Sequence, residues 1–297
     1  MGEFFQSLAA HSFLRNALFA GLLASVACGV VGTWVVTRRI TVIAGSIAHA
    51  VLGGMGAAYY LRVVKHWEWL SPLHGAVAAA LLAALAIGWM KSRGDEREDT
   101  VISAIWSIGI AIGVLFLFLT PGYKTDLMSY LFGNIVMVDA GALRLLVILD
   151  AIVLLAAAAF YNPLLAVCFD EEFARLRGIN VQFFYTLLLC LTALTIVTLI
   201  YVVGVVMVIA LITLPVSVAG RFSRKLWQMM LLSALLCGFL TTAGLAISYQ
   251  PDLPVGATTI LLTAVVYAAV SLGAGLHQRM HRRASTTAAA DREGDKT

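Results

Sequence analysis

Long apolar stretches separated by short polar segments run through almost the whole chain. A helix needs about 20 mostly apolar residues to cross the ~30 Å hydrocarbon core of a bilayer. The spacing of charged residues predicts nine such spans, at 14–37, 42–61, 72–90, 101–120, 141–161, 181–199, 201–220, 227–248 and 256–276. The pattern therefore predicts an all-α polytopic membrane protein.

Residues 178–220 leave the number of spans open, because this stretch contains no Asp, Glu, Lys, Arg or His. At about 1.5 Å per helical residue, it is long enough to cross the bilayer twice. We expect two spans with a tight turn near Tyr201 to Gly204. A single crossing would give eight spans.

Basic residues mark alternate ends of the predicted spans, and the positive-inside rule assigns that side to the cytoplasm. Five clusters carry this signal: Arg38/Arg39, Lys91/Arg93/Arg97, Arg175/Arg177, Arg221/Arg224/Lys225 and Arg279/Arg282/Arg283. Nine spans put the N-terminus outside and the C-terminus in the cytoplasm. We expect an outer segment at 1–13, a transmembrane domain at 14–276 and a disordered cytoplasmic tail at 277–297.

Composition supports a membrane protein, since 61% of the residues are hydrophobic, 12% are charged and the mean hydropathy is +0.93. Soluble domains are about 45–50% apolar and about 25% charged. The net charge of +4 reflects membrane topology and does not indicate nucleic-acid binding. The four cysteines are scattered without CxxC spacing, which is typical of buried apolar positions. The N-terminus lacks the pattern of a cleavable signal peptide.

The common catalytic motifs are absent from the sequence. It contains no GxxxxGK[ST] phosphate loop, no GxSxG elbow and no HExxH pair. We therefore expect a transport protein and not an enzyme, with no permanently bound cofactor. An intramembrane enzyme is a much weaker alternative.

The segment 162–180 predicts a short amphipathic helix between two spans. Acidic residues open it and basic residues follow near its end, as the helix dipole favours, and Gly178 suits the position after its C-terminus. It is either a solvated loop helix or a helix that docks in a groove on a cytoplasmic partner. The residues assigned to docking are Asp170, Glu171, Glu172, Phe173, Arg175 and Gly178.

His49 lies near the middle of the second predicted span, in AGSIAHAVLGGMG. Ionisable groups at this depth are costly. The imidazole is either bonded to a packed neighbour or a metal ligand, and imidazole suits zinc while tolerating iron and manganese. The glycines around it (Gly45, Gly53, Gly54 and Gly56) allow another helix to approach closely.

Asp150 and Pro215 also lie inside predicted spans. Asp150 falls near mid-depth, and Arg144 is six residues away on another face. It is either a protonated or helix-paired carboxyl, or a metal ligand. Pro215 predicts a kink whose free backbone group is satisfied by neighbours, and such a kink would help a gate to bend.

Four blocks in order carry a family resemblance: RRITVIAGSIAHAVLGGMG, TDLMSYLFGNIVMV, FDEEFARLRGI with VIALITLPVSVAGRFSRK, and TAGLAISYQPDLPVGATTILL. Together they resemble the membrane permease subunit of the metal-ion (zinc/manganese/iron) ABC importers. The resemblance implies a homodimer in a bacterial inner membrane, a separate cytoplasmic ATPase subunit and an extracytoplasmic metal-binding protein. It also implies that residues 170–178 couple to the ATPase. The expected substrate is a divalent metal ion, with zinc ahead of manganese and iron.

The sequence departs from this family at its expected metal site. Many members have an aspartate four residues before the histidine, where this chain has Gly45, and a proline–glycine pair where it has Gly53 and Gly54. Either Asp150 supplies a carboxylate from another helix, or the ion passes with fewer ligands. The alternative function is a stand-alone secondary transporter or channel, which would need no ATPase.

Overall fold

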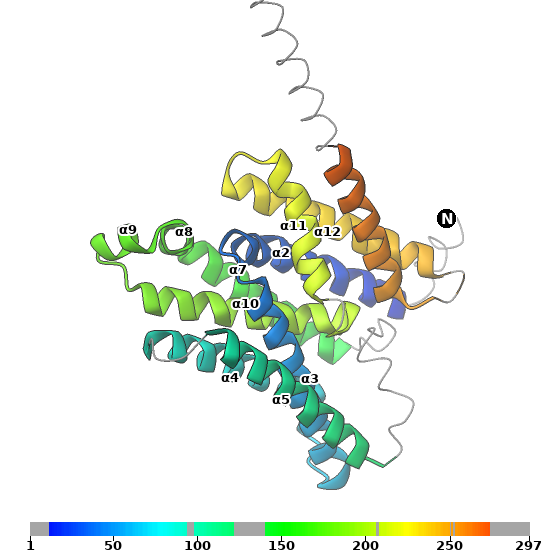
Figure 1. Ribbon diagram of the computed structural model, residues 1–297. Coiled ribbons are helices and arrows are strands. Elements are labelled where there is room, and N and C mark those ends of the chain that lie inside the picture. Colours follow the sequence, from blue (N-terminus) through cyan, green and yellow to red (C-terminus); the bar gives the residue numbers. More distant parts are fainter. Residues whose placement is uncertain are drawn as a thin grey trace, which may run out of the picture.

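The structure is a computed structural model, and it describes residues 12–93, 98–121, 140–205, 208–249, 251 and 253–273. The described residues form a helical bundle (Figure 1). Its helices are α2 (Ser12–Thr37), α3 (Thr41–Val64), α4 (Pro72–Arg93), α5 (Glu98–Leu119), α7 (Ala140–Ala159), α8 (Tyr161–Phe169), α9 (Glu171–Leu176), α10 (Val181–Val203), α11 (Val208–Phe222), α12 (Leu226–Tyr249) and a last helix, Val255–Gly273.

Eight of the described helices are long and apolar enough to cross a membrane, which confirms the all-α polytopic fold. The seventh predicted span, 201–220, corresponds to α11, which has only 15 residues. A helix of that length rises about 22 Å, less than the ~30 Å hydrocarbon core. The predicted turn between the two segments is present, because α10 ends at Gly204 with φ of 83°.

Several sequence predictions fall outside the described residues. They include most of the outer segment 1–13, the tail 277–297 and the block TDLMSYLFGNIVMV. The orientation predicted from the basic clusters stays a prediction.

Helix α10 occupies the centre of the bundle, with α2 and α7 on one side and α4 on the other (Figure 1). Leu188, Leu189, Ile196 and Leu199 of α10 are fully buried. Asn180 caps its first turn, because its side-chain oxygen accepts a hydrogen bond from the backbone N–H of Phe183 at 3.0 Å. Helix α10 therefore provides the buried surface on which α2, α4 and α7 pack.

The glycines of α3 are the points where its backbone meets two neighbouring helices. A Cβ atom added at Gly53 would lie 2.9 Å from the carbonyl oxygen of Gly109 on α5. A Cβ at Gly54 would overlap Gly75 on α4. Small residues let membrane helices approach this closely and gain packing energy without a hydrophobic driving force. The close approach predicted for these glycines is therefore confirmed.

Small residues also join α2 to α11 and α12. A Cβ at Gly29 would overlap the backbone of Ala234 on α12, and one at Gly32 would lie 2.9 Å from the carbonyl oxygen of Ile212 on α11. Two groups of crossings, one around α3 and one around α2, therefore hold the bundle together.

We predict that Gly53→Ala destabilises the protein by about 1–3 kcal/mol, because its methyl group would meet a backbone carbonyl that has no room to move. Gly238→Ala on α12 is the matched control, since its Cβ would lie 3.5 Å from Leu22, an ordinary contact. The control should be neutral or gain up to about 1 kcal/mol from helix propensity. Thermal unfolding in detergent measures both, and equal stability of the two variants would contradict the crossing.

Candidate functional site

Helix α9 forms where the sequence predicts a short helix in the 162–180 connection. Asp170 is its N-cap, and its Oδ1 accepts a hydrogen bond from the backbone N–H of Phe173 at 2.9 Å. Glu171 and Glu172 lie in the first turn and Arg175 in the last, as the helix dipole favours.

The end of α9 is fixed by Gly178, which has φ of 74°. The N–H of Gly178 donates to the carbonyl of Arg175 at 2.9 Å, and the N–H of Ile179 donates to the carbonyl of Ala174 at 3.0 Å. This pair of bonds is a Schellman motif, which needs a residue with positive φ and therefore favours glycine. Ala174 is fully buried in a small cluster with Val167 and Val181, so one face of α9 packs onto the bundle.

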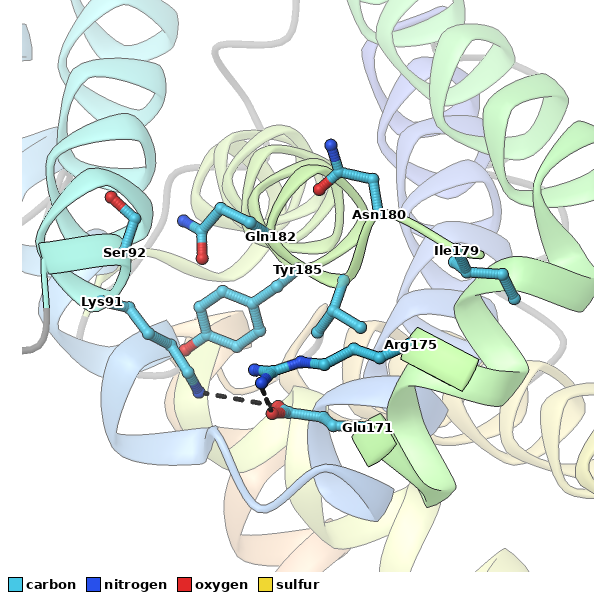
Figure 2. Close-up of a pocket in the computed structure, with 9 residues that line it drawn as sticks. Lys91, Ser92, Glu171, Arg175, Ile179, Asn180, Gln182 and Tyr185 are labelled. Carbon is cyan, nitrogen blue, oxygen red and sulfur yellow. Dashed lines mark ion pairs between the residues drawn. The ribbon is translucent and has the colours of Figure 1, made fainter. Parts of the chain in front are cut away.

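The two glutamates of α9 have different surroundings. Glu171 is 26% exposed and forms an ion pair with Arg38 at the end of α2, while Glu172 is exposed. Two further cations lie near Glu171: Lys91 Nζ of α4 at 4.0 Å and Arg175 Nη2 of α9 at 3.9 Å. Figure 2 shows both of these pairs.

Glu171, Lys91 and Arg175 border an open cavity of about 440 Å³ between α4, α9 and α10 (Figure 2). Tyr185 of α10 is 1% exposed, and Lys91 Nζ lies 3.9 Å from the centre of its ring. Burial raises the pKa of the nearby Cys168 thiol to about 12, against a smaller lowering by Arg38. The thiol stays protonated at neutral pH, so the anionic partner of Arg38 is Glu171.

The outer surface of α9 is apolar at its tip. Leu176 is 88% exposed and Phe173 is 47% exposed. Phe169, just before the helix, is also exposed. These three side chains leave α9 with a hydrophobic surface directed away from the bundle.

His49 lies on α3 with its ring stacked on Trp106 of α5. The ring centroids are 4.4 Å apart and the planes differ by 26°. The Nδ1 atom is buried and has no hydrogen-bond partner. The imidazole is therefore held by the indole and not by a polar neighbour on that nitrogen.

The space one helical turn before His49 is filled. A Cβ at Gly45 would lie 2.9 Å from Cδ1 of Ile209 on α11 and 3.1 Å from Cζ3 of Trp106. A carboxylate at this position would require both side chains to move. Glycine therefore fits the space that Ile209 and Trp106 leave at position 45.

Asp150 lies on α7, is 2% exposed, and neither carboxylate oxygen has a hydrogen-bond partner. Its polar neighbour is Thr198 on α10, whose hydroxyl donates to the carbonyl of Thr195 at 2.8 Å. His49 and Asp150 therefore contact different helices. Among the residues that the structure describes, no three His, Cys, Asp or Glu side chains gather as a metal site, and both metal assignments stay predictions.

Pro215 is buried inside α11 and cannot donate a hydrogen bond to the carbonyl of Leu211, four residues earlier. The thiol of Cys28 on α2 donates to that carbonyl oxygen at 3.3 Å. The prediction that a neighbour satisfies the free group is confirmed, and the gating role of Pro215 stays a prediction.

A second open cavity, of about 530 Å³, lies at the other end of α4, next to Pro72 and Leu73. It is bordered by Arg62, Glu68 and His74, and His74 Nδ1 lies 2.8 Å from the hydroxyl of Ser71. Since α4 is long enough to cross a membrane, the two cavities lie at opposite ends of a membrane span.

Comparison with known proteins identifies the family. The ABC 3 transport family matches residues 10–274, nearly the whole chain. The chain therefore belongs to the ABC 3 transport family. The predicted resemblance is confirmed, and the chain is a multi-pass membrane permease subunit of an ABC transporter, not the ATPase.

Relatives and a solved structure support the assignment along the whole length. A probable metal transport system membrane protein of Chlamydia pneumoniae is 43% identical over 256 residues, covering 86% of this chain and 87% of that protein. The manganese import system permease protein ScaB of Streptococcus parasanguinis is 31% identical, covering 95% and 98%. The structure of PsaBC from Streptococcus pneumoniae in complex with Fab matches with a TM-score of 0.81 and 29% identity, covering 91% of this chain and 94% of that one.

The partners of several site residues in this permease were not predicted from the sequence. Trp106 stacks on His49, Lys91 and Arg38 face Glu171, and Cys28 bonds to the carbonyl that Pro215 leaves free. Only the last had a local signal, because a proline inside a helix predicts one free carbonyl.

We predict that Gly178→Ala loosens α9, because a residue with a Cβ pays about 1 kcal/mol or more in the left-handed region. Amide hydrogen exchange of residues 171–176 should become about fivefold faster, since a local opening near 1 kcal/mol cheaper is that much more populated. Gly178→Asn is the control, because asparagine tolerates this conformation. Equal exchange in Gly178→Ala and the native chain would contradict the proposed role of the positive φ.

Proposed function

We propose that the chain is the permease subunit of an ATP-driven importer of a divalent transition metal. Membership of the ABC 3 transport family carries this proposal. The Chlamydia relative is named as a probable metal transport protein and the Streptococcus relative as a manganese import permease, and both names support it. ATP hydrolysis belongs to a separate cytoplasmic subunit, and an extracytoplasmic binding protein delivers the ion. The working unit is a homodimer of permease chains.

The surroundings of His49 favour zinc over manganese. Imidazole is a good zinc ligand, whereas manganese favours oxygen ligands. The position one turn before His49 has no carboxylate, and a side chain there would require Ile209 and Trp106 to move. The manganese named for ScaB supports the competing assignment. The ligand chemistry at His49 and the metal named for this relative therefore favour different ions.

Asp150 is the candidate for a carboxylate supplied from another helix. It is buried and has no hydrogen-bond partner, so its carboxyl is either neutral or available to a passing cation. In a homodimer, two copies of His49 would provide two imidazoles to one path. Either arrangement gives a transient site with few ligands, which suits an ion that must also leave.

Helix α9 is the docking helix for the ATPase subunit. Its exposed apolar tip, formed by Phe173 and Leu176, lies outside the spans and would face water without a partner. An amphipathic helix of this kind fits a groove on a partner protein. Movement of the ATPase then shifts α9, and the spans alternate between two accessible states, with Pro215 as the point where α11 bends.

We predict that His49→Ala lowers zinc uptake at least tenfold in cells that carry the complete transporter, because it removes the only imidazole on α3. The control is His66→Ala, which changes an exposed histidine just after the same helix. Radiolabelled zinc and manganese are measured in parallel, together with Asp150→Asn. Native zinc uptake in His49→Ala would exclude the histidine as a ligand, and preferred manganese uptake by the native chain would overturn the zinc assignment.

A second prediction concerns docking. Leu176→Glu should weaken binding of the ATPase subunit at least about tenfold, because burying a leucine contributes about 1.5–3 kcal/mol. Leu253→Glu is the control, since Leu253 is exposed in the connection before the last helix. Co-purification of the two subunits in detergent measures the effect. Unchanged binding in Leu176→Glu would exclude α9 as the docking helix.

A further inference from the structure

Glu171 and Glu172 are neighbours with the same charge, yet only Glu171 faces the bundle. Its carboxylate contacts cations on three helices: Arg38 after α2, Lys91 on α4 and Arg175 on α9 itself. Glu172 is exposed. A helix that only docked on a partner would not need this inward carboxylate.

The pair of Glu171 with Arg38 connects α9 to two spans at once. The backbone N–H of Arg38 donates to the carbonyl of Trp34 at 2.8 Å, so Arg38 continues the last turn of α2. The next residue, Arg39, has φ of 61°, and the N–H of Ile40 donates to the carbonyl of Val35 at 3.0 Å. Helix α3 begins at Thr41. A displacement of Arg38 is therefore passed to the end of α2 and to the start of α3.

The pair with Lys91 connects α9 to α4 through a buried aromatic ring. Lys91 Nζ lies 3.9 Å from the centre of the Tyr185 ring, and the Arg38 guanidinium lies 6.0 Å from the same centre. Cations are attracted to the face of an aromatic ring. Tyr185 is 1% exposed on the central helix α10, so both cations lie against a buried ring. Figure 2 shows Lys91 and Tyr185 beside Glu171.

The charges explain why the carboxylate is needed at this point. Arg38 and Lys91 share one ring, and their side chains are only 19% and 31% exposed. Two partly buried cations repel each other unless an anion lies between them. Glu171 is the anion that contacts both.

We propose that Glu171 is a positioning residue through which movement of α9 is transmitted to α2, α3 and α4. This inference rests on the proposed function of α9 as the ATPase docking helix. Within α9, Glu171 contacts the bundle, and the exposed Phe173 and Leu176 would contact the ATPase subunit.

The test uses the complete transporter reconstituted in liposomes, with zinc as the transported ion. Glu171→Gln keeps the shape of the side chain and removes its charge. We expect the ATPase subunit to stay bound while the number of ATP molecules hydrolysed per zinc ion imported rises at least threefold. The control Asp99→Asn, which neutralises an exposed carboxylate at the start of α5 outside the docking helix, should leave this ratio unchanged. A structural defect alone would lower both rates together and leave the ratio as it is.

Charge exchange gives a second, independent measurement. Arg38→Glu alone should raise the ratio at least threefold, and the double variant Glu171→Arg with Arg38→Glu should bring it back to less than twice the native value. A native ratio in Glu171→Gln overturns the proposal. If the Glu171→Gln permease itself does not fold, the exchange pair decides, and absence of rescue relative to Arg38→Glu alone overturns the proposal.

The same measurements separate this inference from the docking role of α9. Unchanged ATPase binding in Leu176→Glu would overturn the docking role. Lost binding in Leu176→Glu together with a native ratio in Glu171→Gln would overturn the Glu171 inference alone. Lost binding of the ATPase in Glu171→Gln would make Glu171 a docking residue and overturn its positioning role.

Discussion

Close approach of helix backbones at glycine is the constraint on which this permease depends. Hydrocarbon gives apolar helices no reason to associate, so contact must come from packing at short range. On α3, Gly53 meets Gly109 of α5. His49 lies one turn before Gly53, and Trp106 lies one turn before Gly109. The crossing that joins the two backbones therefore also places the indole on the imidazole at 4.4 Å.

The second constraint is that backbone groups inside the bilayer need a partner within the protein. Pro215 leaves the carbonyl of Leu211 without its helical donor, and the thiol of Cys28 supplies one. The sequence predicts Cys28 as a small, buried apolar side chain. The side chain is buried, but its role as a hydrogen-bond donor was not predicted. Because Gly32 admits Ile212 and Val216 of α11 to the same face of α2, the thiol reaches the carbonyl.

The sequence predicts interactions between residues that are close along the chain, and it does not predict which distant residues meet. The ends of α9 were predictable, since Asp170 and Gly178 act within a few residues of themselves. The close packing at Gly53 and Gly54 was predictable from composition, but the partner helices were not. The different roles of Glu171 and Glu172 had no local signal, because Arg38 and Lys91 are distant in sequence. The seventh predicted span, 201–220, does not reach full length, since a run without charges does not define where a helix ends.

The position of Arg38 explains how a short helix outside the spans can act on a residue inside them. From Thr41 at the start of α3 to His49 is about two helical turns, or roughly 12 Å at 1.5 Å per residue. Residues 43–48 of α3 are all buried, so this part of the helix is packed on every side. Under the proposed coupling role of α9, a shift at the turn after α2 would change the contact between His49 and Trp106, and no longer pathway between α9 and the middle of the membrane would be required.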